Sequence, residues 1–202
     1  MAIKTIFWDI GGVLERTEDP APRKAIAAEL GWEIHDLARL LFGHSDNFRI
    51  QLGQITMDQH SANIARSLGI TRDELSNIIT AFFAGDRLDR ELVTHIRQLR
   101  KDYQIGVISN YTPILRPKIN DLWQIGDTFD TLTISSEVGV MKPEEAIYQI
   151  ALEKADTRPE QAVFIDDFIE NVGGAQKVGM HAIHFRSASQ TLDELHNLLD
   201  QT

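Results

Sequence analysis

The chain has 202 residues, of which 43% are hydrophobic and 25% are charged, so it can form one core domain with a modest insertion and is too apolar for wholesale disorder. Its formal net charge of −10 argues against a general nucleic-acid or anionic-membrane binder, because both partners would be repelled, whereas a metal ion in one pocket can still attract a small anionic substrate. The absence of cysteine excludes disulfides, thiolate metal sites and cysteine nucleophiles.

The N-terminal residues run into a short apolar stretch that ends at Asp9. This stretch is too short for a signal peptide, and no later run reaches the length of a membrane span, so we expect a cytoplasmic protein. Similar apolar runs follow at 105–108, 129–134, 162–165 and 182–185, separated by helical patterns at 89–101, 114–123, 144–154 and 168–178. Short buried strands that alternate with helices predict an α/β fold with a doubly wound, Rossmann-like parallel sheet.

The segment 15–86 interrupts this alternation. It contains no convincing strand and favours four or five helices, with capping boxes at Thr56 to Gln59 and at Thr71 to Glu74. The sequence therefore predicts a core domain made of residues 1–14 and 87–202, and a helical domain made of residues 15–86.

Polar residues follow the predicted strands where ligands bind in a doubly wound sheet, beyond the carboxyl ends. They are Asp9, Ser109 with Asn110, Lys142, and Asp166 with Asp167. Carboxylates without a histidine or cysteine cluster suit a hard cation such as Mg²⁺, and a metal, a lysine and a hydroxyl together suit a phosphoryl group. An aspartate at a strand end can attack such a group. Each residue alone also has a structural explanation, as a turn former or a solvated side chain.

Four segments resemble, in order, the motifs of the haloacid dehalogenase-like hydrolase superfamily. They are FWDIGGVL at 7–14, VISN at 107–110, SEVGVMKP at 136–143, and FIDD at 164–167 with the downstream Glu170, Asn171, Gly174 and Ala175. The resemblance covers the whole chain, and the segment 15–86 is similar to the small α-helical cap of the family.

The resemblance implies a Mg²⁺-dependent phosphatase that forms an aspartyl-phosphate on Asp9. It also implies that Ser109 and Asn110 bind the phosphate and that Lys142 steadies the nucleophile and the transferring group. The metal ligands would be Asp9, the carbonyl of Gly11 and Asp167. Asp166 is a second candidate for the metal, or would orient Lys142 or a metal-bound water, and Asn171 would lie in the outer metal shell.

The chain departs from the family pattern at Gly11, where family phosphatases usually carry an aspartate that serves as general acid and base. Glycine keeps the carbonyl but loses the proton-transfer group, which typically contributes about 10²- to 10⁴-fold in rate. Glu15 is the nearest acid that could replace it; Glu18 and Asp19 follow in the same loop, and His44 could reach the site from the cap.

Three functions stay open at this point. The first is a phosphatase that acts on a small phosphorylated metabolite such as a sugar phosphate, selected by polar cap residues: Arg49, His44, Gln51 and Gln54. The second is a non-catalytic protein that binds a phosphorylated metabolite. The third is a 2-haloacid dehalogenase, which the paired acids at 166–167 disfavour because that chemistry in the family uses no metal. The sequence does not determine the oligomeric state.

Overall fold

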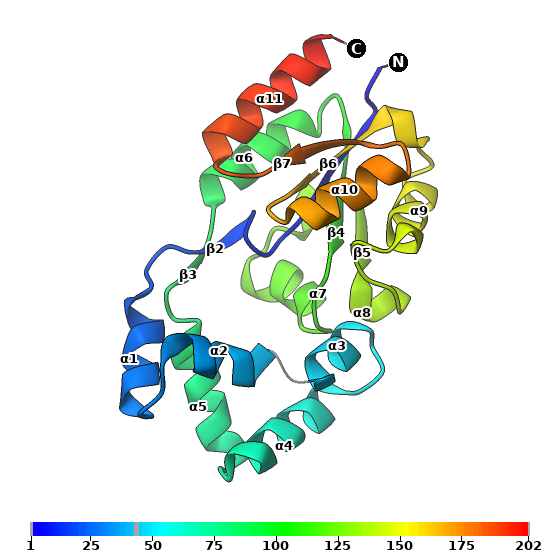
Figure 1. Cartoon of the computed structure of the whole chain (residues 1–202). Coiled ribbons are helices and arrows are strands. Elements are labelled where there is room, and N and C mark those ends of the chain that lie inside the picture. Colours follow the sequence, from blue (N-terminus) through cyan, green and yellow to red (C-terminus); the bar gives the residue numbers. More distant parts are fainter. Residues whose placement is uncertain (1, 43–44, 202) are drawn as a thin grey trace.

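The computed structural model describes residues 2–42 and 45–201, and its centre is a parallel sheet with the strand order β5-β4-β1-β6-β7 (Figure 1). The strands are β1 (Thr5–Trp8), β4 (Gln104–Ser109), β5 (Thr131–Ile134), β6 (Ala162–Asp166) and β7 (His181–His184). Trp8 lies opposite Val107 of β4 and Ile165 of β6, so the residues that follow these three strands emerge at one edge of the sheet. This is the α/β architecture that the sequence predicted.

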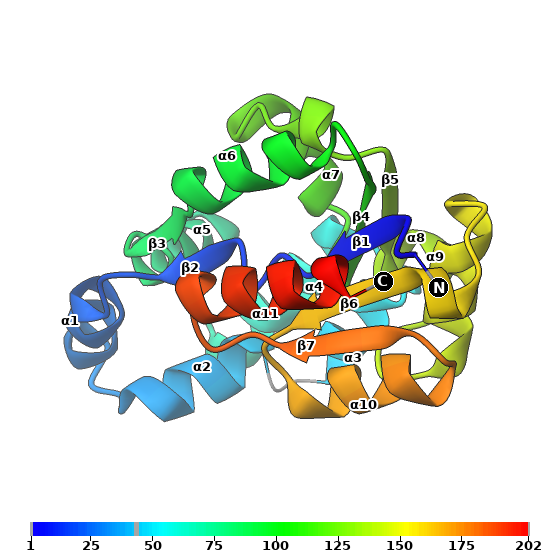
Figure 2. The same cartoon turned by 90° about the horizontal axis from the view of Figure 1, so that it is seen from above.

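Helices cover both faces of the sheet, because neighbouring strand residues point to opposite faces and both sets are apolar. Ile6 and Trp8 of β1 pack in one buried cluster with α6 and α11, and Phe7 packs in a second cluster with α9 and α10 (Figure 2). The helices and turns of this part are α6 (Arg90–Leu99), α7 (Leu115–Pro117), a π-helical turn (Lys118–Leu122), a 3₁₀ turn (Gly126–Thr128), α8 (Ser135–Val138), α9 (Glu145–Lys154), a 3₁₀ turn (Pro159–Gln161), α10 (Ile169–Lys177) and α11 (Ala188–Asp200).

Helices fill most of the segment between β2 and β3 and lie beyond the carboxyl ends of the sheet strands (Figure 1). They are α1 (Ala21–Glu29), α2 (Ile34–Phe42), α3 (Ser45–Gln51), α4 (Met57–Leu68) and α5 (Arg72–Phe82). They share a buried apolar cluster of their own that includes Leu37, Ile64 and Phe82. The capping boxes predicted at Thr56 and Thr71 are both present, so the starts of α4 and α5 are confirmed.

The prediction that the segment 15–86 contains no strand is wrong. Strand β2 (Glu15–Thr17) pairs with β3 (Asp86–Leu88) in an antiparallel ribbon that joins the helices to the sheet. Both strands are three residues long and mostly polar, so neither shows the apolar alternation by which a strand is identified in a sequence. Side chains add to the backbone pairing: Thr17 donates to Asp86 across the ribbon at 2.9 Å, and Arg23 of α1 donates to both carboxylate oxygens of Asp86, at 2.9 and 2.8 Å.

Among the described residues, no helix is both long and apolar enough to cross a membrane.

Candidate active site

Lys142 links two aspartates at the carboxyl edge of the sheet. Its Nζ atom lies 2.6 Å from Oδ2 of Asp166 and 2.9 Å from Oδ2 of Asp9, and all three residues are buried. Asp9 follows β1 and Asp166 ends β6, whereas Lys142 comes from the loop after α8. The two aspartates meet because β1 and β6 are neighbours in the sheet, and the loop after α8 adds Lys142, which is 133 positions from Asp9 in the chain.

Asp166 uses its carboxylate oxygens within the protein. Asn171 donates to both of them, at 3.0 and 3.1 Å, the backbone N–H of Phe168 donates to Oδ1 at 2.7 Å, and Lys142 occupies Oδ2. This saturated carboxylate has the geometry of a group that positions Lys142. The Asn171 amide faces Asp166 and supports that arrangement.

The backbone of Lys142 is fixed by Asn110. The Asn110 side-chain carbonyl accepts from the Lys142 N–H at 2.7 Å, and its amide donates to the Lys142 carbonyl at 2.9 Å. Asn110 thus serves as a clamp on the loop that presents the lysine, in addition to lining the cavity beside the site. Ser109, the preceding residue, is buried and forms a hydrogen bond with Asp9.

Burial raises the pKa of Asp9 from its ordinary value of 3.8 to about 6. The Lys142 ammonium acts in the opposite direction, the neighbouring Asp166 carboxylate raises the pKa further, and the hydrogen bond from Ser109 lowers it. Three carboxylates crowd around one ammonium, because Asp167 lies beside the other two. A cation at this place would stabilise Asp9 in its ionised, nucleophilic form.

A divalent cation fits the residues that surround Asp9. In the part of the chain that the structure describes, Asp9, Asp166 and Asp167 form the one group of three acidic or histidine side chains whose ligand atoms lie within 4.8 Å of one another. The buried Oδ1 atom of Asp167 has no hydrogen-bond partner among the described residues. Burial and the Asp166 charge raise the pKa of Asp167. Oxygen donors of this kind suit Mg²⁺, and because Asp166 is already saturated, the geometry favours Asp9 and Asp167 as its carboxylate ligands.

Gly12 allows Asp167 to approach the loop after β1. Its φ of +78° is unfavourable for other residues, and a Cβ atom there would lie 2.1 Å from Oδ2 of Asp167. Gly11 differs: its φ is outside the left-handed region, and a Cβ atom would meet no atom within 4 Å.

Gly12→Ala should therefore lower the free energy of unfolding by about 2 kcal/mol, since it combines a left-handed backbone with a steric clash. Gly11→Ala, which has neither problem, is the matched control and should stay within about 0.5 kcal/mol of the wild type. Urea denaturation of the three proteins measures both differences. Equal stability of the two variants would contradict this account of Gly12.

Glu15, the nearest candidate for the missing general acid, lies beside Gly11 but is already engaged. Its backbone N–H donates to the Ile10 carbonyl at 2.8 Å, its carboxylate forms an ion pair with Lys118, and the Tyr111 hydroxyl donates to its Oε2 at 3.0 Å. Burial and the Glu15 charge raise the pKa of Tyr111. Sequence reasoning missed Lys118 and Tyr111. Tyr111 follows directly after the Ser109-Asn110 motif, which was the available signal, whereas nothing in the sequence distinguishes Lys118 from other lysines.

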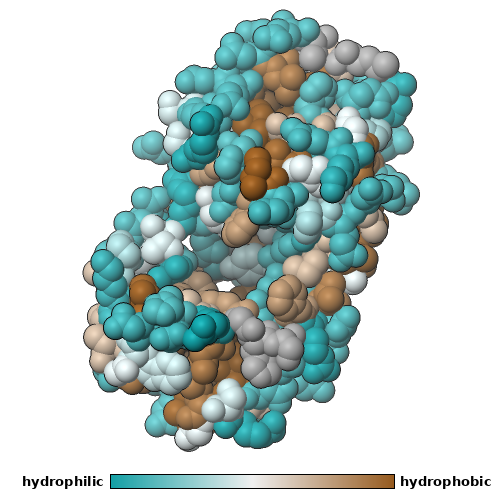
Figure 3. All heavy atoms as spheres, viewed as in Figure 1, coloured by the Kyte–Doolittle hydropathy of each residue, from teal (hydrophilic) through white to brown (hydrophobic). Residues whose placement is uncertain are grey.

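A cavity of about 710 Å³ opens between the site and the helices α1 to α5, and Figure 3 shows the opening between the two parts of the molecule. Gly11, Gly12 and Asn110 line its side toward the sheet. Four polar cap residues were predicted to select the substrate, and of these Gln51 lines the cavity. Arg49 instead pairs with Asp46 at 2.9 Å, and Gln54 is not part of the lining. His44 lies outside the described residues.

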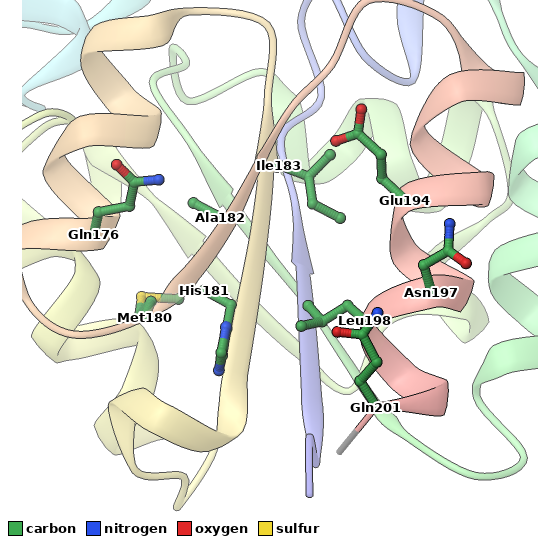
Figure 4. A pocket seen from close by; sticks show the side chains of 9 residues that line it. All are labelled: Gln176, Met180, His181, Ala182, Ile183, Glu194, Asn197, Leu198 and Gln201. Atoms are coloured by element: carbon green, nitrogen blue, oxygen red, sulfur yellow. The ribbon is translucent and has the colours of Figure 1, made fainter. Parts of the chain in front are cut away.

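A second, shallower pocket of about 480 Å³ lies at the start of β7, between α10 and α11 (Figure 4). His181 and Gln176 face it from one side and Glu194 from the other, and Glu194 is paired with Arg186 at 3.0 Å. This pocket is at the amino end of the strand, away from Asp9 and Asp166. It therefore does not contribute to the site.

Comparison with known proteins agrees with this geometry. A family model described as haloacid dehalogenase-like hydrolase matches residues 3–179. A sesquiterpene phosphatase from Aspergillus oryzae is 26% identical over 97% of this chain and 96% of its own length, and D-ribitol-5-phosphate phosphatase from Bacteroides thetaiotaomicron is 23% identical over 98% and 99%. Other curated relatives are longer, and the chain spans 36% of one and 35% of another.

The solved structures show the same fold. The crystal structure of a family enzyme from Bacteroides thetaiotaomicron, in complex with magnesium and inorganic phosphate, has a TM-score of 0.74 at 22% identity, covering 91% of this chain and 94% of that chain. The family match includes the inserted helices and every strand of the sheet except β7. With Asp9, Ser109, Lys142 and the acid pair at one sheet edge, the chain belongs to the haloacid dehalogenase-like hydrolase family.

Proposed function

We propose that the protein is a Mg²⁺-dependent phosphatase that hydrolyses the monoester of a small phosphorylated metabolite. The observation that carries this proposal is the pairing of a buried Asp9 with Lys142 beside the unpartnered Oδ1 atom of Asp167. Two relatives of nearly equal length are named as phosphatases, and the related crystal structure holds magnesium and phosphate.

In the proposed reaction an oxygen of Asp9 attacks phosphorus, and the bond from phosphorus to the alcohol oxygen breaks. Because residue 11 has no carboxyl group, the leaving oxygen takes its proton from water. Water then attacks the aspartyl-phosphate, which releases inorganic phosphate and restores the Asp9 carboxylate. Lys142 and Ser109 hold the phosphoryl oxygens in line with Asp9. Mg²⁺ on Asp9, Asp167 and the Gly11 carbonyl would neutralise phosphate charge.

The helices between residues 15 and 86 act in this proposal as a cap. Asp9, Lys142 and Ser109 act on the phosphoryl group, so selection among substrates falls to the cavity walls, most of which the cap supplies. The cavity between these helices and the sheet edge supports this role.

Phosphate release from p-nitrophenyl phosphate with Mg²⁺, followed by a panel of phosphorylated metabolites, tests the proposal. The aryl leaving group needs little protonation, so the assay succeeds even without a general acid. No release from any ester would favour the non-catalytic alternative. Chloride release from a 2-haloacid in the presence of EDTA would favour the dehalogenase.

The absence of a carboxyl group at residue 11 should make the rate depend steeply on the leaving group. Aryl phosphates should react far faster than alkyl phosphates, and Gly11→Asp should raise kcat/KM for alkyl phosphates by about 10²-fold while changing aryl phosphates less. The open space and ordinary φ at Gly11 allow the new side chain. The measurement is kcat/KM for one alkyl and one aryl phosphate in both proteins.

Glu15→Gln is the control for this prediction. If Glu15 already supplies the proton, the wild type should show a flat dependence on the leaving group that becomes steep in Glu15→Gln. A flat dependence in the wild type, Gly11→Asp and Glu15→Gln alike would remove this explanation of Gly11.

A further inference from the structure

The cavity beside the site has a wall of large apolar side chains. They come from α2, α4 and α5, from the residue that follows α5, and from the turn before α7: Phe42, Ile64, Ile79, Phe83 and Ile114. From this wall we propose that the substrate carries a bulky apolar organic group, an alkyl or aryl chain, which the cavity binds while the phosphoryl group meets Asp9. This inference rests on the proposed phosphatase function and narrows its substrate class.

Two of these side chains are only partly covered by the protein. Phe83 is 38% exposed and Ile114 is 43% exposed, and both line the cavity. The Arg23 guanidinium lies over the Phe83 ring, 5.7 Å from its centroid. The Phe83 ring is held by Phe42 and Phe82, with ring centroids 5.6 and 5.4 Å away. When an apolar group covers an aromatic surface that is open to water, the free energy of the complex is lowered.

The charges that line the cavity are neutralised within the protein. Glu15 pairs with Lys118, Arg23 with Asp86 at 2.8 Å, and Arg16 with Asp89 at 2.7 Å. Each arginine and lysine among the described lining residues therefore already has an acidic partner. A second anionic group on the substrate would have to break one of these pairs. A neutral organic group avoids that cost.

The polar side chains of the lining that carry no charge lie apart from the apolar wall on α3 and α4, and toward the sheet: Asn47, Gln51, His60 and Ser61 on the helices, and Thr17, Asn110, Tyr111 and Thr112 on the other side. A sugar or polyol presents hydroxyls along its whole length, and each buried hydroxyl needs a partner. The apolar wall offers it none. An alkyl or aryl chain fits that wall without leaving a hydroxyl unpartnered against it.

The test is a series of n-alkyl phosphates from ethyl to octyl, assayed with Mg²⁺, together with hexitol 6-phosphate as the polyol equivalent of hexyl phosphate. The alkyl esters share one leaving-group chemistry, so changes in kcat/KM report binding of the chain. We expect kcat/KM to rise about two- to fourfold per methylene, fourfold being the equivalent of full transfer out of water at 0.8 kcal/mol. Hexyl phosphate should exceed hexitol 6-phosphate at least tenfold. A flat series, or a faster hexitol ester, would overturn the inference.

Ile114→Asn should flatten the dependence on chain length, because it places an amide in the apolar wall. Leu122→Asn is the matched control, since Leu122 is 68% exposed and does not line the cavity, and it should keep the wild-type slope. An unchanged slope in Ile114→Asn would contradict the assigned wall.

Calorimetry with non-hydrolysable phosphonates separates this inference from the proposed function. If the protein released no phosphate from any ester, including p-nitrophenyl phosphate, the phosphatase proposal would fail. The cavity would still be tested, because octylphosphonate should bind at least tenfold more tightly than ethylphosphonate in the presence of Mg²⁺. Equal affinities would overturn the apolar subsite.

Discussion

Asp9→Asn should reduce phosphate release by at least about a thousandfold while the fold stays intact. The amide is nearly isosteric with the carboxylate but cannot attack phosphorus, and loss of a nucleophile removes most of the rate enhancement of a covalent mechanism. The measurement is turnover of p-nitrophenyl phosphate together with the thermal midpoint of both proteins. Retention of more than a few per cent of the activity would mean that Asp9 is not the nucleophile.

The stability of this variant can be predicted from the pKa of Asp9. Folding raises that pKa from 3.8 to about 6, so ionised Asp9 destabilises the metal-free protein. The free energy of unfolding therefore falls as the pH rises from about 4 through about 6. Asn cannot ionise, so at pH 7 without metal Asp9→Asn should unfold at the same temperature as the wild type or above it. Asp102→Asn, at an exposed position, is the control and should retain both activity and stability.

Removal of divalent cations should abolish turnover, and Mg²⁺ should restore it. Asp9 and Asp167 supply only part of an octahedral shell, so phosphate and water complete it, and Ca²⁺ should serve poorly because its looser geometry misplaces the attacking carboxylate. Mg²⁺ should also stabilise the fold, by about 2.7 kcal/mol in the free energy of unfolding at a Mg²⁺ concentration of a hundred times its Kd. The thermal midpoint should rise accordingly. Full turnover after exhaustive chelation would contradict the metal site.

Asp167→Asn distinguishes a metal ligand from a structural acid. It should increase the Mg²⁺ concentration needed for half-maximal activity at least tenfold and reduce the Mg²⁺-dependent gain in thermal midpoint. Asp193→Asn, on α11 and remote from the sheet edge, is the matched control. If both variants required the same Mg²⁺ concentration as the wild type, Asp167 would not bind the metal.

The position of the site could be predicted because parallel strands bring their carboxyl ends to one edge. Asp9 and Asp166 each come at the end of an apolar run, and Lys142 comes shortly after another such run, so all three were expected at this edge. The roles within the site were harder to predict. The two acids at 166–167 are adjacent in sequence, and only the hydrogen bonds from Asn171 show which of them is saturated.

The cavity walls could not be predicted from the sequence. Phe42 and Phe82 both belong to the apolar stripes of amphipathic helices, yet Phe82 is buried in the cluster among the helices whereas Phe42 lines the cavity. A stripe indicates that a helix buries one face, and it does not tell whether protein or ligand covers each residue of that face. The pairing of Glu15 with Lys118 could not be predicted either, because it depends on the position of a π-helical turn 103 residues further along the chain.

The ribbon of β2 and β3 has a consequence for the evolution of the chain. Thr17 lies opposite Asp86, so the polypeptide leaves the sheet and returns to it through neighbouring residues. When the two ends of a loop are held together, doubling its length costs only about 0.6 kcal/mol of closure entropy. The stretch between these ends can therefore be lengthened, shortened or exchanged while the register of β1 with β4 is kept. Selection for a new leaving group can act on that stretch without disturbing the lysine and the aspartates.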